Sequence, residues 1–184
     1  SLEVVQMIGA TGSEQRLNTD GPILSQLLAE RLGGIYRHLH APLILESKEV
    51  HQALLQDRSI SETLKRAENA DIALIGIGST RPELYSILRA GYVNEEETRR
   101  IREQGAVGDI CGQHFDISGN KLDVELSSRA VAVSLEALKK IPVVLGVAGG
   151  EKKGDAILAA LRGGYVNYLI TDEAAARWIH TRAG

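Results

Sequence analysis

The 184-residue sequence contains a single cysteine, Cys111, and it lacks long apolar segments. One thiol cannot close an internal disulfide bond, and it excludes metal sites of the CxxC type. No apolar run approaches the roughly 20 residues that a membrane span needs, and residues 1–5 lack the basic-then-apolar pattern of a signal peptide. These absences predict a soluble, cytoplasmic protein without membrane contact.

Aromatic residues are scarce, and neither sign of charge dominates. The chain has one tryptophan, one phenylalanine and five tyrosines, which argues against a binding pocket built on ring stacking. Its 21 basic and 24 acidic residues give a formal net charge of −3, which offers no bulk attraction to nucleic acid. The hydrophobic fraction of 43% suits one globular core, so a single domain over residues 1–184 is expected.

The chain is rich in glycine, and aliphatic runs alternate along it with segments of helical periodicity. Nineteen of its 184 residues are glycine, against an average of about 7%. Short aliphatic runs alternate with segments of helical periodicity, which predicts an α/β fold with a doubly wound, mainly parallel sheet. The apolar run 72–77 predicts a central strand covered on both faces. Residues 109–124, with a turn at 118–120, predict a small antiparallel excursion.

Two helix starts carry the spacing of a capping box. Ser59 precedes Glu62 by three residues, and Asn94 precedes Glu97 by three residues. In a capping box the side chain of the N-cap residue accepts a hydrogen bond from the backbone N–H of the third helical residue. The side chain of that third residue accepts one from the backbone N–H of the N-cap residue. Both pairs therefore predict where a helix begins.

Three glycine loops follow predicted strands, at residues 9–13, 76–80 and 148–153. In a doubly wound sheet, ligands collect at the carboxyl ends of the strands, where such loops let backbone N–H groups meet anions. The run 76–81 has arginine where a dinucleotide fingerprint needs its third glycine. The run 149–154 is followed by Asp155, not by the lysine of a P-loop. No cofactor is therefore predicted, whereas a small phosphorylated ligand is compatible with the pattern.

Three charged residues are candidates for binding such a ligand. Lys153 lies at the expected start of a helix, where a cation is unfavourable unless it has an anionic partner such as a phosphate. Arg89 lies in the last turn of a helix, where a cation is favourable in any case. Asp109 begins a strand and can either accept hydrogen bonds from sugar hydroxyls or cap a turn. A purely structural role stays open for each of the three.

Metal binding and nucleophilic catalysis have little support. His38 and His40 share one strand face, but no HExxH motif or carboxylate cluster accompanies the histidines, so no metal site is predicted. No serine stands in a GxSxG motif, and Ser79 is interpreted as a loop hydroxyl that binds an anion. Cys111 is interpreted as a small buried residue rather than a nucleophile. No catalytic residue is assigned.

Four segments, taken in order, resemble the sugar-binding domain of SorC-type (DeoR/SorC) bacterial transcriptional regulators. They are ADIALIGIG at 70–78, GAVGDICG at 105–112, IPVVLGVAGG at 141–150 followed by Lys153, and YLITDEAA at 168–175. The match spans essentially all 184 residues. Each segment is modestly specific alone, and their order makes the resemblance strong.

The resemblance implies a phosphosugar-isomerase-like fold, related to glucosamine-6-phosphate deaminases and ribose-phosphate isomerases, that senses a phosphorylated sugar. In this family an N-terminal helix-turn-helix domain binds the operator DNA of a carbohydrate-use operon, and the sugar-binding domain assembles into dimers or tetramers. The helix-turn-helix and the family's first strand, with its Gly-Thr-rich loop, are expected to lie outside this chain. The implied partners are a phosphorylated sugar, operator DNA through the absent domain, and further copies of the protein.

The resemblance also implies roles for individual residues. Lys153 resembles the family's effector- or phosphate-contacting lysine, Asp109 resembles the acidic residue that faces the sugar, and Arg89 resembles a basic residue that contacts a phosphate. Further effector contacts are implied for Gly9, Gly78, Gly149, Gly150 and Asn18.

Two other functions stay open at this point. A sugar-phosphate isomerase or deaminase could use the same fold, with Asp109 or Glu151 as its base, although no carboxylate–histidine pair stands at a readable spacing. A domain that only oligomerises is the other possibility. The preferred interpretation is an effector-binding domain that is not an enzyme.

Overall fold

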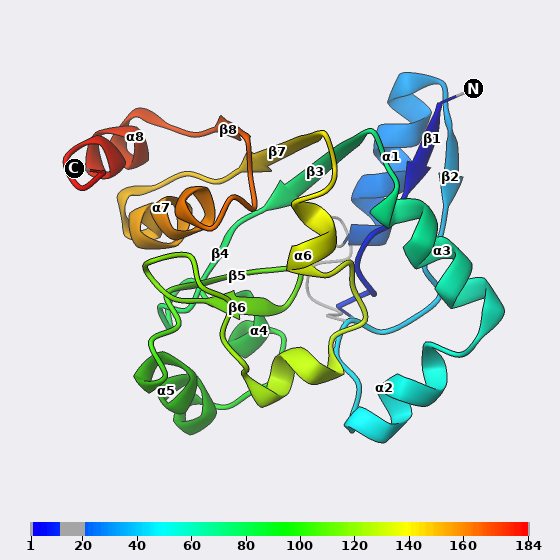
Figure 1. Cartoon of the computed structure of the whole chain (residues 1–184), viewed down its shortest axis with the longest axis horizontal. Coiled ribbons are helices and arrows are strands. Elements are labelled where there is room, and N and C mark those ends of the chain that lie inside the picture. Colours follow the sequence, from blue (N-terminus) through cyan, green and yellow to red (C-terminus); the bar gives the residue numbers. More distant parts are fainter. Residues whose placement is uncertain (1, 12–20, 184) are drawn as a thin grey trace. The chain divides into compact units, whose positions relative to one another are not determined.

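The computed structural model describes residues 2–11 and 21–183 (Figure 1). The chain divides into two compact units. The first comprises the residues up to Ala70 together with Glu125–Val133, and the second comprises Asp71–Val124 and the residues from Ser134 onward. Within the described residues, no helix is long and apolar enough to cross a membrane.

The first unit pairs two short strands in parallel and adds helices to them. Val4 of one strand is in register with Tyr36 of the other. Glu3 forms ion pairs with Arg37 at 2.6 Å and with Arg66 at 3.4 Å. The elements are β1 (Glu3–Val5), α1 (Gly21–Leu32), β2 (Ile35–Arg37), α2 (Lys48–Leu54), α3 (Arg58–Glu68) and the 3-10 helix η2 (Glu125–Arg129).

One predicted helix start in this unit is wrong. Asp57, not Ser59, is the N-cap of α3, because its carboxylate accepts hydrogen bonds from the backbone N–H groups of Ser59 and Ile60. The hydroxyl of Ser59 donates to the same carboxylate at 2.6 Å. An acidic N-cap also interacts favourably with the helix dipole. The helix therefore begins at Arg58, two residues earlier than a Ser59 N-cap would place it.

The second unit holds a parallel and an antiparallel sheet (Figure 1). The parallel sheet has the strand order β3-β7-β8, and the antiparallel sheet has the order β4-β5-β6. The elements are β3 (Ile72–Gly76), β4 (Gly78–Ser79), α4 (Ser86–Arg89), α5 (Glu95–Glu103), β5 (Gly108–Ile110), β6 (Gln113–Phe115), α6 (Leu135–Leu138), β7 (Val143–Val147), the 3-10 helix η3 (Glu151–Lys153), α7 (Gly154–Arg162), β8 (Tyr168–Ile170) and α8 (Glu173–His180).

The predicted class, a mixed α/β fold with parallel sheets, is confirmed. The prediction of one doubly wound sheet is not, because the described strands pair into three separate small sheets of two, three and three strands. Apolar runs and helical periodicity indicate which segments are strands. They do not determine which strands share hydrogen bonds, since that pairing depends on contacts between distant residues.

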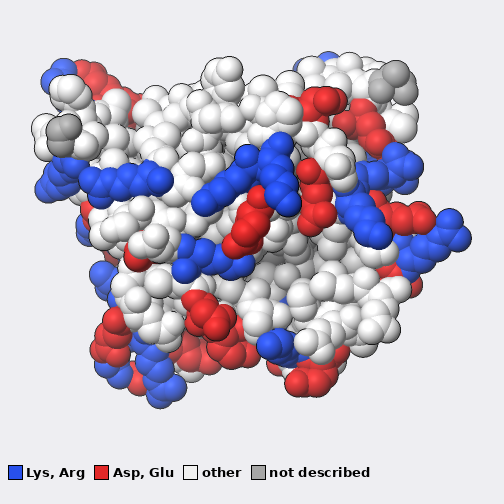
Figure 2. Space-filling view, viewed as in Figure 1, with Lys and Arg blue, Asp and Glu red and all other residues white. Residues whose placement is uncertain are grey.

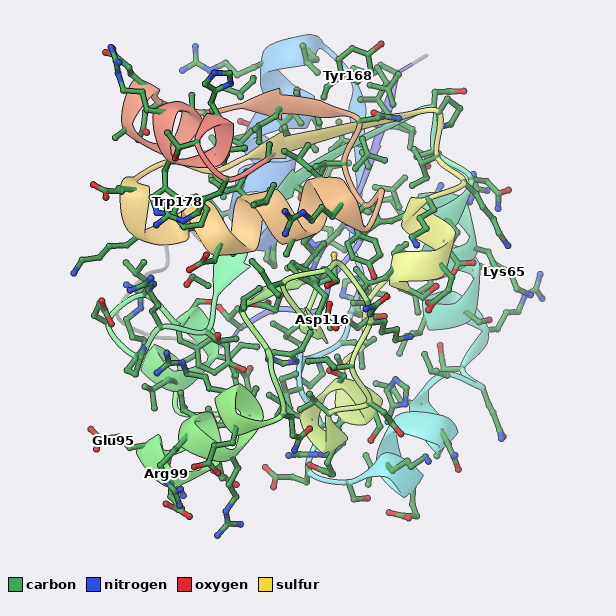
Figure 3. The ribbon with its side chains drawn as sticks, turned by 60° about the vertical axis from the view of Figure 1, so that its left-hand side comes forward. Lys65, Glu95, Arg99, Asp116, Tyr168 and Trp178 are labelled. Atoms are coloured by element: carbon green, nitrogen blue, oxygen red, sulfur yellow. The ribbon has the colours of Figure 1, made fainter. Side chains whose placement is uncertain are left out.

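The prediction that strand 72–77 is covered on both faces is also wrong for the described residues. Ala73 and Ile75 are buried, but Ile72 and Leu74 are 63% and 49% exposed. Leu74 is in register, through β7, with Tyr168 of β8, which is 57% exposed and points away from the ribbon in Figure 3. One face of the parallel sheet is therefore apolar and open in the described part of the chain.

The antiparallel excursion is present, and the predicted turn at 118–120 is confirmed, because Phe115 and Lys121 pair antiparallel across it. A further hairpin turn, which was not predicted, lies earlier in the segment. Cys111 and Gly112 join β5 to β6, with φ angles of 55° and 72°. Two consecutive positive φ angles in a two-residue loop are typical of a type I′ turn. Cys111 is thus a half-buried turn residue rather than a core residue. The predicted turn at 118–120 forms a second, Asp116-stabilised turn after β6.

The other predicted capping box is confirmed. Asn94 accepts a hydrogen bond from the N–H of Glu97, whose carboxylate accepts one from the N–H of Asn94.

On the face seen in Figure 2, acidic and basic side chains lie interspersed. This distribution agrees with the small net charge of the chain.

Candidate functional site

The loops after the three parallel strands of the second unit lie at one edge of the sheet. Ile77 and Gly78 follow β3, Ala148 and the two glycines after it follow β7, and Thr171 follows β8. Parallel strands place their carboxyl ends together, and this edge is where open α/β sheets bind ligands. The candidate site is built from these loops and from the adjacent antiparallel sheet.

Asp109 of β5 is the most buried charged residue at this edge. It is 7% exposed, and its Oδ1 atom has no hydrogen-bond partner among the described residues. Burial raises its pKa to about 6, although a hydrogen bond from the backbone of Gly112 and the charge of Lys153 act in the opposite direction. A buried acceptor without a donor is costly. Asp109 therefore has the capacity to accept a hydrogen bond from a ligand.

Gly78 provides the space for this carboxylate. Asp109 and Gly78 are paired across the antiparallel sheet, and a Cβ atom at position 78 would overlap Asp109 Oδ1. The glycine predicted to line the pocket thus has a steric role next to the predicted acidic contact.

Lys153 lies against the loop after β3. Its Nζ donates a hydrogen bond to the backbone carbonyl of Ile77 at 2.8 Å. Burial lowers the pKa of this lysine, the charge of Asp109 raises it, and the charge of Arg89 lowers it. The structure therefore brings Lys153 within electrostatic reach of both other predicted charged residues, Asp109 and Arg89. Arg89 lies in the last turn of α4, as expected.

Gly149 and Gly150 already have an anionic neighbour. The N–H of Gly150 donates to Asp172 Oδ2 at 2.6 Å, and a Cβ atom at Gly149 would lie 2.6 Å from the same oxygen. Asp172 also caps α8 through the N–H of Ala175. A ligand anion at the backbone of Gly150 would have to displace this carboxylate, which sequence reasoning did not single out.

Two predicted contacts are not among the described residues of the second unit. Gly9 belongs to the first unit, where its N–H donates to the carbonyl of Val131 at 2.9 Å and a Cβ atom would overlap the carbonyl group of Pro42. A glycine is therefore required at position 9 because the backbone of residue 42 packs closely against it. Asn18 lies outside the described residues.

Tyr85 and His114 form a buried polar pair that the sequence did not reveal. His114 belongs to the strand that neighbours Asp109. His114 of β6 is the cross-strand partner of Asp109. Its Nε2 shares a 2.6 Å hydrogen bond with the hydroxyl of Tyr85, and both side chains are fully buried. Burial lowers the pKa of His114 to about 4 and, with the charge of Asp109, raises that of Tyr85. Both groups are therefore neutral at pH 7.

The cysteine does not have the properties of a nucleophile. Burial and the charge of Asp109 raise the pKa of the Cys111 thiol to about 12, so it stays protonated at neutral pH. The hydroxyl of Ser79 accepts a hydrogen bond from the N–H of Arg81 at 3.3 Å. Among the described residues, no group of three His, Cys, Asp or Glu side chains could hold a metal ion.

Two ion pairs join the loop after β4 to the start of α7. Arg81 Nη2 lies 3.3 Å from Asp155 Oδ2, and Lys152 Nζ lies 3.2 Å from Glu83 Oε1. None of these four residues was predicted as part of the site, because their partners stand about 70 positions away in the sequence.

Comparison with known proteins identifies the family of this chain. The family model described as "Putative sugar-binding domain" matches residues 1–180. The transcriptional regulator LsrR of Enterobacter sp. (strain 638) is 41% identical over 146 residues, which cover 78% of this chain and 45% of that protein. The deoxyribonucleoside regulator of Bacillus subtilis (strain 168) is 37% identical over 176 residues, which cover 96% of this chain and 55% of that protein.

Solved structures agree with the sequence comparison. The full-length sorbitol operon regulator SorC of Klebsiella pneumoniae matches with a TM-score of 0.86 and 27% identity, covering 95% of this chain and 56% of that one. A DeoR family transcriptional regulator from Listeria monocytogenes matches with a TM-score of 0.87 and 27% identity, covering 97% and 69%. The chain spans about half the length of the two curated relatives.

Proposed function

This chain belongs to the sugar-binding domain family of SorC- and DeoR-type transcriptional regulators, and on that premise we propose that it binds a phosphorylated sugar as the effector of such a regulator. The family is the one that the four sequence segments predicted. The matched relatives are transcriptional regulators and not enzymes, which agrees with the preferred interpretation over the isomerase or deaminase alternative.

The observation that carries the proposal is the grouping of Lys153, Arg89 and Asp109 at the carboxyl edge of the parallel sheet. Two cations that interact with each other favour an anionic ligand, and charge-assisted hydrogen bonds to a phosphate would supply it. The open Oδ1 of Asp109 needs a donor, which a sugar hydroxyl provides. A phosphorylated polyhydroxyl compound meets both requirements at once.

The remaining roles in the proposal follow from the family. Gly78, Gly149 and Gly150 would line the effector. The fold would be that of phosphosugar isomerases. The effector would shift a conformational or oligomeric equilibrium of a cytoplasmic dimer or tetramer, and a helix-turn-helix domain outside this chain would carry the change to operator DNA.

Ligand titration of Lys153→Ala tests the proposal. Wild-type protein is titrated calorimetrically with ribose 5-phosphate, glucose 6-phosphate and fructose 6-phosphate, and with the three sugars without phosphate. We expect at least one sugar phosphate to bind, its parent sugar to bind far more weakly, and Lys153→Ala to weaken binding by roughly tenfold or more, as the loss of a charged hydrogen bond predicts.

Lys152→Ala is the matched control, because Lys152 is the adjacent lysine and its side chain is 66% exposed in a surface ion pair. This variant should bind within about twofold of wild type, since exposed ion pairs contribute little. Equal weakening by both substitutions, or no binding of any sugar phosphate to the wild type, would count against the assignment.

A further inference from the structure

The ion pair between Arg81 and Asp155 is incomplete. A guanidinium has five N–H donors, yet within residues 2–11 and 21–183 the Arg81 side chain makes one contact, from Nη2 to Asp155 Oδ2 at 3.3 Å. Charge-assisted bonds of this type are usually about 2.7–2.9 Å long, and arginine binds carboxylates and phosphates best through two parallel bonds. The two side chains are 43% and 34% exposed. Arg81 therefore keeps most of its hydrogen-bonding capacity for another partner.

The start of α7, to which this pair belongs, lacks a side-chain cap. Lys153 occupies the N-cap position, has helical backbone angles and provides no cap hydrogen bond. The positive end of the helix dipole favours an anion at this position, and Asp155 is the acidic residue in the first turn. A cation at the N-cap position is unfavourable for the helix dipole, and it increases the demand for negative charge at this helix start.

The helix start is closely packed against its neighbours. Gly154 is buried, and a Cβ atom there would overlap the indole of Trp178 on α8. Figure 3 shows Trp178 next to α7. On the other side, Lys153 Nζ is bonded to the carbonyl of Ile77, which immediately precedes Gly78 and the buried, open carboxylate of Asp109.

We propose that Arg81 binds the phosphate group of the effector, and that Asp155 holds the Arg81 guanidinium in position until the phosphate replaces it. This inference rests on the proposed function and assigns its phosphate contact to a residue outside the family-implied set. A phosphate offers several oxygens to the guanidinium and carries more negative charge than a carboxylate, so it competes with Asp155 for Arg81. Lys153 and Arg89 keep the phosphate contacts proposed above, so that Arg81 adds to them, and Asp109 remains for the sugar hydroxyls.

Opposite effects of two substitutions test the exchange. Arg81→Gln and Asp155→Asn both remove the same ion pair. If the pair were only structural, both variants would change effector binding in the same direction. If Asp155 competes with the phosphate, Arg81→Gln weakens binding by at least tenfold, whereas Asp155→Asn strengthens it several-fold because the guanidinium is released.

The measurement is calorimetric titration of the full-length protein with the sugar phosphate from the panel that binds wild type most tightly. Inorganic phosphate serves as a second probe that lacks the sugar. Glu83→Gln is the matched control, because it removes the neighbouring Lys152 ion pair between the same two segments, and it should change the dissociation constant by less than twofold. Thermal unfolding midpoints within a few degrees of wild type establish that each variant is folded.

The outcomes separate this inference from the proposed function. If wild type binds a sugar phosphate and Lys153→Ala weakens it, but Arg81→Gln and Asp155→Asn act in the same direction or not at all, the exchange is overturned and the effector site stands. If no sugar phosphate binds wild type, both are overturned.

Discussion

The carboxylate of Asp109 occupies the volume that a side chain at Gly78 would need. The two residues are paired across the antiparallel sheet, and the sequence separates them by 31 positions. Gly78, at the start of β4, thus leaves the space that the Asp109 carboxylate of β5 occupies. This relationship links the shape of the loop to the proposed sugar contact, and its consequences can be measured.

Gly78→Ala should displace the carboxylate of Asp109 or the backbone around it. Inserting atoms into a packed site commonly costs about 1–3 kcal/mol, and we expect a loss of this size in the free energy of unfolding, measured by urea denaturation. Gly76→Ala is the matched control, because nothing lies within 4 Å of a Cβ atom at that position. A loss that is the same for both variants would contradict the steric role of Gly78.

The free energy of unfolding should depend on pH through Asp109. Its pKa is raised on folding from 3.8 to about 6, so the native state holds the proton more tightly than the unfolded chain does. The stability from this carboxyl is full below about pH 4 and is lost as pH rises through about 6. At 1.36 kcal/mol per pKa unit, the loss is about 3 kcal/mol.

Asp109→Asn isolates this contribution, because asparagine does not titrate in this range. The difference in unfolding free energy between the variant and wild type should grow in favour of the variant from pH 4 to pH 7. His114 acts in the opposite sense, since its lowered pKa makes stability fall as pH drops below about 6.5, but it is present in both proteins. A difference that is independent of pH would show that Asp109 does not titrate near 6.

Tyr85→Phe removes the hydroxyl that is bonded to Nε2 of buried His114. Loss of a buried hydrogen bond costs about 1–3 kcal/mol, and we expect a decrease of this size in the free energy of unfolding, measured by chemical denaturation. Tyr168→Phe provides the comparison, because Tyr168 is 57% exposed and should change stability by less than about 0.5 kcal/mol. Equal stabilities of the two variants would argue against a structural role for the Tyr85–His114 pair.

Local features of the fold could be predicted from the sequence. The Asn94–Glu97 capping box formed as expected, and α1 ends at Leu32, before Gly33 with its φ of 66°. Such signals depend on residues three or four positions apart, whose geometry is set by the backbone. The type I′ turn at Cys111 was missed, because cysteine is not among the residues that usually mark such turns.

The sequence by itself determined the alternation of strands and helices, the glycine loops after predicted strands, and the candidates Lys153, Asp109 and Arg89. Only the tertiary structure decided that Asp109 is buried with an open oxygen, that Asp172 occupies the backbone N–H of Gly150, and that Arg81 faces Asp155. The reason is physical. Local propensity acts along the chain, whereas burial, desolvation and ion pairing depend on residues that folding brings together from distant positions.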